Sequence, residues 1–452
     1  MIPTNNSRGS VLILTMGVVV FLTGLALVFS RQMRVEALAS ENLLLQVQAD
    51  AAVRGAAQHI LNRLASNLDQ TTLDSEIQSE AVHIGDGQFW CVRPDQADEH
   101  NYAFGIMDES SKLNINTATA DMLLRLPGMT PELAASIVDW RDPDDIVGDG
   151  GGAESQYYLQ LPEPYNCKNA PFETLGELLL VKGATRELLY GKDANRNGVI
   201  DASERGGEGP LSGLNGQMEC GLCKYLTVYS MEVNRTQNGD ARTLIADTTA
   251  RSMTALSNLL SKTLSAARVA EVIARMSGGP PPLNVLDFYF KSGLKLDEFK
   301  SISDSITTSR EGVRVGLINV NTAPREVLRC LPGLEEGDID QIIAKRQSNG
   351  PDLNNIAWVA DILNAQKAIQ VGEYLTTRSS QFSADITGVC GNGRSFKRAR
   401  YVFDIRNTPP RILNRKDLTY LGWPLSTAIS DALQSGLPVA GTSTQSFSLG
   451  KK

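Results

Sequence analysis

Histidine is nearly absent from this chain of 452 residues. The three histidines, His59, His83 and His100, are scattered through its early part. Neither a Ser-His-Asp nor a Cys-His catalytic set can be assembled from them, and an imidazole-rich transition-metal site is disfavoured. No glycine-rich phosphate-binding loop follows a predicted strand. We therefore expect no catalytic residues and no enzymatic activity.

Charged residues are absent from the run Val11–Phe29. About 20 apolar residues cross a bilayer core as one helix, and a helix satisfies its own backbone hydrogen bonds there. We predict a transmembrane helix over residues 10–30. A secretory signal has a shorter apolar core of roughly 7–15 residues, but an ordinary uncleaved anchor is an open alternative. The formal net charge of −8 gives the chain no general attraction to nucleic acid or anionic lipid.

Proline is missing from residues 31–68, where Ala, Leu, Gln and Glu are frequent. Val53, Ala57 and Ile60 recur there at helical spacing. We predict a stalk helix over 31–68 that continues the membrane run, about 80 Å in all at 1.5 Å per residue. Its upper half would pack on a globular head. A joint near Arg31–Arg34 that divides it into two helices is the alternative.

Cysteine is sparse, with six in the chain, and only Cys220 and Cys223 are close together in the sequence. A zinc site would need a second such pair or a nearby histidine, and the sequence has neither. We predict a structural disulfide between Cys220 and Cys223, formed in an oxidising compartment such as the periplasm. Free thiols are the alternative.

Short β-branched and aromatic segments lie near both ends of the chain. They cover residues 81–84, 88–93 and 102–107 before a long helical region, and 381–388 and 396–405 after it. The composition of the first group and the period-two alternation of the second group favour strands, so we expect both groups to build one antiparallel sheet. Lys397, Arg398 and Arg400 would form an exposed face of that sheet. The Ser-, Thr- and Gly-rich tail 426–452 has too little apolar content to be ordered.

A repeated unit occupies the region between these strands. Residues 113–129 read LNINTATADMLLRLPGM and residues 318–334 read INVNTAPREVLRCLPGL, an offset of 205 residues. The shared residues include Asn116, Thr117, Pro127 and Gly128 in the first copy, and Asn321, Thr322, Pro332 and Gly333 in the second. Such self-similarity indicates two copies of one structural unit. A worn third copy is expected to start at Ala246.

Each copy is predicted to be a short helix, a Leu-Pro-Gly turn and a second helix. Thr117 and Thr322 stand where an N-cap belongs, because a hydroxyl there can accept from an unpaired first-turn amide. Pro324 fits a first helical position in the second copy. Since such a pair cannot bury its apolar face alone, further helices must surround it. We interpret residues 113–377 as an all-α insertion.

The unit resembles helix–hairpin–helix modules, some of which bind DNA phosphates through hairpin amides. A DNA-binding hairpin wants a second glycine and nearby cations, but Glu335, Glu336, Asp338 and Asp340 crowd the second copy. We therefore favour a structural, scaffold role for these hairpin residues and expect no nucleic-acid partner. A membrane-anchored DNA-binding protein for DNA uptake is the alternative function.

Residues 193–204 fit the twelve-residue calcium loop of EF-hands. Oxygen ligands would come from Asp193, Asn195, Asn197, the Val199 carbonyl, Asp201 and a bidentate Glu204, with Gly198 at the turn. Residues 185–190 can form an entering helix, whereas 205–210 cannot form an exiting one. We predict a lone structural Ca²⁺ loop, with a metal-free polar turn as the alternative. A second acidic loop could hold another cation, although its spacing fits no template; its residues are Asp142, Asp144, Asp145, Asp149 and Glu154.

The residues before the membrane run resemble the leader of type IV pilin-like proteins. In that superfamily a prepilin peptidase cuts after a glycine, so the cut here would fall between Gly9 and Ser10. The usual first mature residue is larger than Ser. Most members carry Glu five residues into the mature chain, where this chain has Leu14. The lack of that Glu is similar to the minor pseudopilin called type II secretion protein K.

Further motifs between the two copies strengthen this resemblance. They are Asp139-Trp-Arg-Asp with Asp144-Asp145, a glycine-rich acidic loop before Tyr157-Tyr158, Lys168-Asn-Ala-Pro-Phe, and Glu177-Leu-Leu-Leu-Val-Lys-Gly. Their order is similar to that of protein K, and the resemblance covers most of residues 8–425. It implies an α+β fold in which a transmembrane and stalk helix carries a pilin-like antiparallel sheet head, interrupted by a large all-α insertion.

The resemblance also implies the organisation and role of the chain. The expected segments are a leader 1–9, a transmembrane helix 10–30, a stalk 31–68, a head 69–112 plus 378–425, an insertion 113–377 and a tail 426–452. The protein would be a minor pseudopilin at the tip of the pseudopilus, initiating or capping its assembly for protein export. Its partners would be minor pseudopilins I and J and the prepilin peptidase. It would cross the inner membrane once, with its bulk in the periplasm.

Overall fold

A single long helix carries the rest of the molecule. The computed structural model describes residues 8–66, 76–95, 101–201, 204, 220–247, 249–348, 352–437 and 439. Helix α1 runs unbroken over Arg8–Leu64, so the predicted continuous helix is confirmed and a joint at Arg31–Arg34 is wrong. By length and composition, helix α1 contains a stretch near its N-terminus that is long and apolar enough to cross a membrane. Most of the predicted leader, residues 1–7, lies outside the described residues.

A seven-stranded antiparallel sheet and the C-terminal part of α1 that covers it form the body that we call the head. The strands are β1 (Val82–Ile84), β2 (Gly87–Pro94), β3 (Tyr102–Phe104), β4 (Met107–Asp108), β13 (Gln381–Cys390), β14 (Ser395–Asp404) and β15 (Arg411–Asp417). The order is β1-β2-β13-β14-β15, with β3 on β2 and β4 on β13. Because β2 pairs with β13, strands from both ends of the chain share one sheet. Strand β15 is an addition to those predicted.

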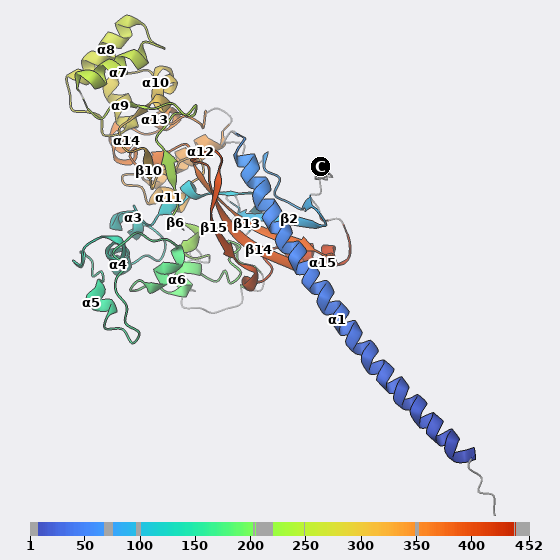
Figure 1. Cartoon of the computed structure of the whole chain (residues 1–452). Helices are drawn as coiled ribbons and strands as arrows, with labels where there is room; N and C mark the ends of the chain where they lie inside the picture. The colour runs from blue at the N-terminus through green and yellow to red at the C-terminus, as the bar shows by residue number, and fades with distance from the viewer. Residues whose placement is uncertain are drawn as a thin grey trace, which may run out of the picture.

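The C-terminal part of α1 packs across one face of this sheet. Val53 and Ile60 of α1 are buried against Ile386 of β13 in one apolar cluster. The backbones approach each other closely at Gly388, where a Cβ atom would lie 2.8 Å from the carbonyl oxygen of Ala49. The sheet therefore needs a residue without a side chain beneath the helix. Figure 1 shows the other part of α1 extending away from the head.

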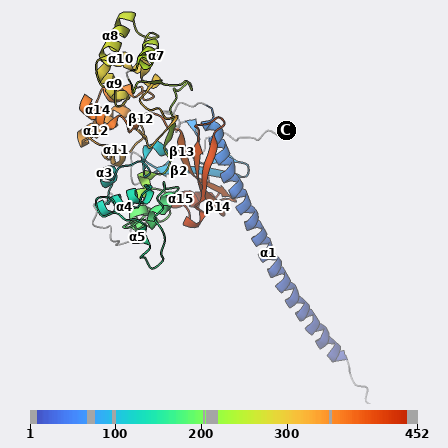
Figure 2. The same ribbon diagram turned by 60° about the vertical axis from the view of Figure 1, so that its left-hand side comes forward.

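The long insertion between β4 and β13 contributes most of the remaining helices. Its first half contains η1 (Glu109–Ser111), α3 (Ala120–Leu124), α4 (Pro131–Arg141), α5 (Ser155–Tyr158), η2 (Leu175–Leu180), α6 (Arg186–Tyr190) and η3 (Leu222–Lys224), where η denotes a 3-10 helix. Its second half contains α7 (Ala250–Leu260), α8 (Ala266–Ser277), α9 (Val285–Ser292), α10 (Leu296–Ile302), η4 (Ser303–Ser305), α11 (Arg325–Arg329), α12 (Glu336–Gln347), α13 (Ala357–Ala360) and α14 (Ala365–Val371). Figures 1 and 2 show the insertion on the side of the sheet away from α1, with α7 and α8 reaching past the head end of α1.

The insertion is not all-α, which corrects the sequence-based prediction. It contains four two-stranded ladders: β5 (Leu113–Asn114) with β6 (Leu226–Thr227), β7 (Met231–Val233) with β10 (Val313–Val315), β8 (Thr243–Leu244) with β9 (Ile306–Thr307), and β11 (Ile318–Asn319) with β12 (Leu375–Thr376). Each strand has only two or three residues. Strands this short show no recognisable alternation, and their partners lie far away in the sequence.

The start of the predicted disordered tail is also ordered. After η5 (Thr419–Leu421), helix α15 covers Thr427–Gln434. Leu433 of α15 is buried with Trp90 and Val389 of the sheet in a second apolar cluster on the head. The prediction of disorder from residue 426 is therefore wrong, because a few apolar residues at helical spacing find a partner that only the folded head provides. Residues 440–452 lie outside the described part of the chain.

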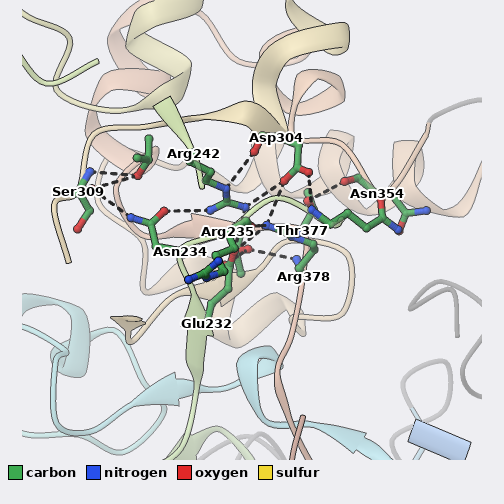
Figure 3. A network of polar contacts seen from close by, with 12 residues as sticks. Glu232, Asn234, Arg235, Arg242, Asp304, Ser309, Asn354, Thr377 and Arg378 are labelled. Carbon is green, nitrogen blue, oxygen red and sulfur yellow. Dashed lines mark hydrogen bonds and ion pairs between the residues drawn. The ribbon is translucent and has the colours of Figure 1, made fainter. Parts of the chain in front are cut away.

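A polar network ties distant segments of the insertion together (Figure 3). Glu232 of β7 is 5% exposed and accepts hydrogen bonds from Arg242 and Arg378, both at 3.2 Å. Asp304 of η4 forms ion pairs with the same two guanidinium groups, at 3.1 and 3.0 Å. The carboxylates of Glu232 and Asp304 thus share two arginines. The network fixes the chain after β6, before β8 and after β12 relative to one another.

Candidate metal centre

The repeated unit supplies the frame on which the candidate site is built. Three parallel ladders, β5 with β6, β8 with β9 and β11 with β12, recur along the insertion. In each, the amide after the first strand donates to the partner strand: Ile115 to Thr227 (2.9 Å), Ile245 to Thr307 (2.8 Å) and Val320 to Thr376 (3.0 Å). The segment just before Ala246, where the worn third copy is expected to start, therefore has the same kind of ladder as the two clear copies.

The residues that the two clear copies share have structural partners. Asn116 donates to the Phe172 carbonyl at 3.0 Å, and Asn321 donates to the Leu353 carbonyl at 2.7 Å. Arg141 donates to the carbonyls of Ile115 and Ala118, and Arg346 donates to those of Val320 and Ala323. After Pro127 and Pro332, Gly128 and Gly333 adopt φ of 70° and 77°, a left-handed conformation that suits glycine. These contacts hold the turn and close the unit.

The N-cap prediction for Thr117 and Thr322 is wrong. The first short helix begins after Thr119, whose hydroxyl accepts from the Met122 amide at 3.2 Å, and Pro324 is the N-cap of α11. Tight turns occupy the predicted cap positions, because the amides of Thr117 and Thr322 donate to backbone carbonyls three residues earlier, both at 3.1 Å.

Cations around the second copy are engaged within the unit. Arg329 pairs with Glu336 at 2.5 Å, and Lys367 pairs with Asp338 at 2.6 Å. Arg325 also pairs with Glu336, at 2.8 Å. Phosphate binding depends on available cations. The paired charges give the DNA-binding alternative no support.

The predicted calcium loop folds so that its side chains converge. Asp193 accepts from the amides of Asn197 (3.1 Å) and Gly198 (2.8 Å). Glu204 accepts from the amides of Ala194, Asn195 and Asp201 at 2.9, 3.2 and 3.0 Å. Asn195 and Asn197 both donate to Asp201 Oδ2, at 2.7 and 3.2 Å. Val199, the predicted carbonyl ligand, is buried. Helix α6 enters the loop as predicted; residues 205–219 lie outside the described part.

The electrostatics of this loop favour a cation. Asp193 is 3% exposed. Burial raises the pKa of Asp193 to about 6, and the neighbouring Glu204 carboxylate adds to the rise. A buried carboxylate that faces another carboxylate is stabilised in its charged form by a bound cation. The donor set consists of carboxylate, amide and backbone oxygens, which is what Ca²⁺ prefers. The residues present therefore fit a calcium ion.

Arg398, which the sequence analysis placed on an exposed face, attaches the loop to the head sheet. Arg398 of β14 is 0% exposed, so the prediction that it belongs to an exposed basic face is wrong. Its guanidinium donates to both carboxylate oxygens of Asp385 on β13, at 2.8 and 2.7 Å. The same group donates to the carbonyls of Asn195 (2.5 Å) and Arg196 (3.1 Å) in the loop. The insertion covers this face of the sheet, which sequence alternation alone cannot reveal.

The second acidic loop also gathers part of its predicted ligands. Carboxylate oxygens of Asp142, Asp144 and Glu154 lie within 4.8 Å of one another. Both carboxylate oxygens of Glu154 are buried and lack a nitrogen or oxygen donor among the described residues. Burial, followed by the charges of Asp139 and Asp142, raises the pKa of Glu154 to about 7. This buried carboxylate, whose neighbour is the weak thiol donor of Cys167, fits a cation.

Two other predicted members of that second loop do not join the cluster. Asp145 instead accepts from the Asn169 side chain at 3.0 Å, and Asp149 is exposed. Asp139, which the ligand prediction omitted, lies near the cluster: its charge adds to the raised pKa of Glu154, and it is 1% exposed and accepts from the Gly148 amide at 3.1 Å. Its place in the last turn of α4, three residues before the C-cap Asp142, is a signal that could have identified it.

The six cysteines all lie in the described part of the chain, and no disulfide joins any two of them. The predicted Cys220–Cys223 disulfide is therefore absent from the structure. The two thiols have different partners, because Cys220 Sγ donates to the Gly198 carbonyl at 3.3 Å and Cys223 Sγ to the Cys220 carbonyl at 3.6 Å. Cys220 thus contacts the loop of residues 193–204.

The fold and the site together define the class of protein. A long helix with an apolar N-terminal part carries a sheet head, and the insertion in that head contains a loop that suits a cation. Residues 105–190 and residues 318–384 each match the family described as type II secretion system (T2SS), protein K. The chain matches this family over these two stretches, which include both clear copies of the repeat. A chain of the GspK-GspI-GspJ complex from the type 2 secretion system of enterotoxigenic Escherichia coli, a crystal structure, is 12% identical, with 85% of this chain and 99% of that chain covered and a TM-score of 0.37. The comparison with curated proteins gave no match.

Proposed function

We propose that this minor pseudopilin stands at the tip of the type II secretion pseudopilus, where it initiates or caps assembly. The observation that supports this proposal best is the combination of an apolar N-terminal helix with a bulky insertion that extends beyond the head. Side chains from Val11 to Phe29 in α1 are exposed and uncharged, which suits a single-pass anchor in the inner membrane with the head in the periplasm. The proposal needs no catalytic group.

Two features support a terminal position. First, the fifth residue of the proposed mature chain is Leu14, so the chain lacks a carboxylate for pairing with the N-terminus of a subunit ahead of it. Second, α7 and α8 reach past the head end of α1, where a following subunit would have to stack (Figures 1 and 2). Steric exclusion above and free helix surface below are compatible with a tip.

The proposed partners are the minor pseudopilins I and J. Between the membrane segment and the head, α1 exposes Val35, Leu38, Leu43, Leu44 and Val47. Exposed apolar side chains on a helix pack well against other apolar helices. We propose that it docks the N-terminal helices of the two partners.

The processing route is the first prediction. Peptidase cleavage after Gly9 would leave Ser10 as the N-terminus of the membrane-bound protein. Mass spectrometry of the protein from cells with the prepilin peptidase should find a start at Ser10, and cells without the peptidase should yield Met1. Met1 in both cells would contradict the pilin route and would favour a plain anchored protein.

We further propose that residues 193–204 bind Ca²⁺ as a structural ion. Asp193, Asn195, Asn197, Asp201 and Glu204 would supply side-chain oxygens and Val199 its carbonyl. The ion would neutralise the facing carboxylates of Asp193 and Glu204, which otherwise repel each other. The cluster of Asp142, Asp144 and Glu154 is proposed as a second, separate cation site.

Calcium binding is the second prediction. Titration calorimetry of the full chain in detergent with Ca²⁺ up to millimolar concentration should show binding heat. Asp193→Ala should remove the heat of the 193–204 loop, and Glu154→Gln should remove that of the second cluster only. Asp240→Ala, at an exposed position outside both loops, is the matched control. If Asp193→Ala leaves the titration unchanged, the loop is a polar turn without metal.

A further inference from the structure

We infer that Arg398 couples occupancy of the calcium loop to docking of the insertion on the head sheet. The inference rests on the proposed calcium site, and it assigns a role to residues that are not ligands. One buried guanidinium contacts both partners: Asp385 of the sheet, and the carbonyls of Asn195 and Arg196 in the loop. It is therefore a direct physical connection between the two parts.

The two carbonyls belong to the stretch of the loop that sets the ligands. Asn195 and Asn197, two proposed ligands, flank Arg196, which has the left-handed φ of 56°. A residue with a side chain rarely adopts this conformation. The hydrogen bond of Arg398 to the Arg196 carbonyl stabilises it at 3.1 Å, and Arg400 adds another at 3.2 Å. The sheet thus helps to hold the ligand-bearing backbone in its binding geometry.

Two more contacts attach the same turn to the head. The side-chain amide of Asn197 donates to the Pro424 carbonyl at 2.9 Å, which leaves its Oδ1 directed into the loop. Gly198 lies against β2, because a Cβ atom there would be 2.3 Å from Pro94 Cγ. The head therefore contacts the loop from β14, from β2 and from the segment after η5. A change in loop shape without the ion would disturb all three contacts.

Charge balance explains why the connection requires Asp385 as well. An arginine close to a calcium site would by itself repel the ion. Asp385 is 5% exposed and pairs with Arg398 and Arg400, both through Oδ2, at 2.7 and 2.8 Å. The pair lets Arg398 bind the loop carbonyls while much of its field is compensated. Coupling of this kind is reciprocal, so calcium should stabilise the sheet–insertion contact as much as that contact stabilises calcium binding.

The third prediction tests this linkage in the full chain in detergent. Lysine cannot replace the forked donor of arginine, so Arg398→Lys should raise the Kd for Ca²⁺ by at least about 5-fold, the lower end of typical coupling. Lys397→Gln is the matched control, since it lies on the same strand but on the opposite face of the sheet, and its Kd should stay that of the wild type. Titration calorimetry measures all three proteins.

The outcomes separate the two proposals. Wild-type binding with an unchanged Kd in Arg398→Lys would overturn the coupling and leave the calcium site intact. If the wild type and Asp193→Ala give the same binding heat, the calcium site and the coupling are both overturned. If Arg398→Lys does not fold, amide hydrogen exchange of the wild type with and without calcium tests the same coupling. Calcium should slow amide hydrogen exchange in β14 as well as in residues 193–201, relative to the distant α7 and α8; slowing confined to the loop would contradict the inference.

Discussion

Replacing Asp385 with alanine is expected to lower the free energy of unfolding by about 3–5 kcal/mol. The reason is that Arg398 is 0% exposed and would lose its only bidentate carboxylate partner among the described residues. Its bonds to the carbonyls of Asn195 and Arg196 would remain, but these neutral acceptors cannot balance a buried charge. Removal of one member of a buried ion pair costs far more than the pair itself contributes.

Chemical denaturation of the full chain in detergent measures this loss. Asp361→Ala is the matched control, because Asp361 pairs with Lys345 at the surface, where their side chains are 47% and 40% exposed. Such a pair contributes about 0–1 kcal/mol. Equal losses in the two variants would show that the Arg398–Asp385 pair is solvated and not part of the core.

The same pair gives a pH dependence with a definite sign. Burial alone would raise the pKa of Asp385, but the charges of Arg398 and Arg400 outweigh it and hold the pKa below its ordinary value of 3.8. The stability contributed by this carboxylate is therefore present above pH 3.8 and is lost as the pH falls through the folded pKa. In Asp385→Ala the loss of stability below that pH should be shallower than in the wild type. It should not vanish, because Arg406 similarly lowers the pKa of Asp404.

The second large effect is expected from Gly388→Val, which should separate α1 from the sheet. A Cβ atom at Gly388 would lie 2.8 Å from the Ala49 carbonyl oxygen and 3.0 Å from the Val53 amide nitrogen. Both are backbone atoms of a helix and cannot rotate away. Overpacking usually costs about 1–3 kcal/mol, and a rigid obstacle places this variant at the upper end of that range or above it.

Thiol labelling reports the displacement directly. Cys390, at the end of β13, is buried under Leu45 and Ala49 of α1. In Gly388→Val we expect a thiol reagent to modify Cys390 at a much higher rate, as determined by peptide mass. Gly312→Val is the control, because no atom lies within 4 Å of a Cβ there. Unchanged labelling of Cys390 in Gly388→Val would contradict the close packing of α1.

Much of the local structure could be predicted from the sequence because its causes are local. An uncharged run and a proline-free stretch determine α1, β-branched and aromatic composition determines β2, and period-two alternation determines β13 and β14. The calcium loop is equally local, since its proposed ligands come from twelve consecutive residues and its own amides close it. The two clear repeats are visible in the sequence for the same reason.

Only the tertiary structure decided the features that depend on distant partners. The short ladders pair segments such as Leu113–Asn114 and Leu226–Thr227, and α15 finds its cover on Trp90 and Val389. Arg398 looks like a surface residue in sequence, because alternation shows which side chains share a face but not what covers that face. The insertion covers that face. Arg398, which the sequence predicts on a solvated surface, is therefore buried and joins the sheet to the loop.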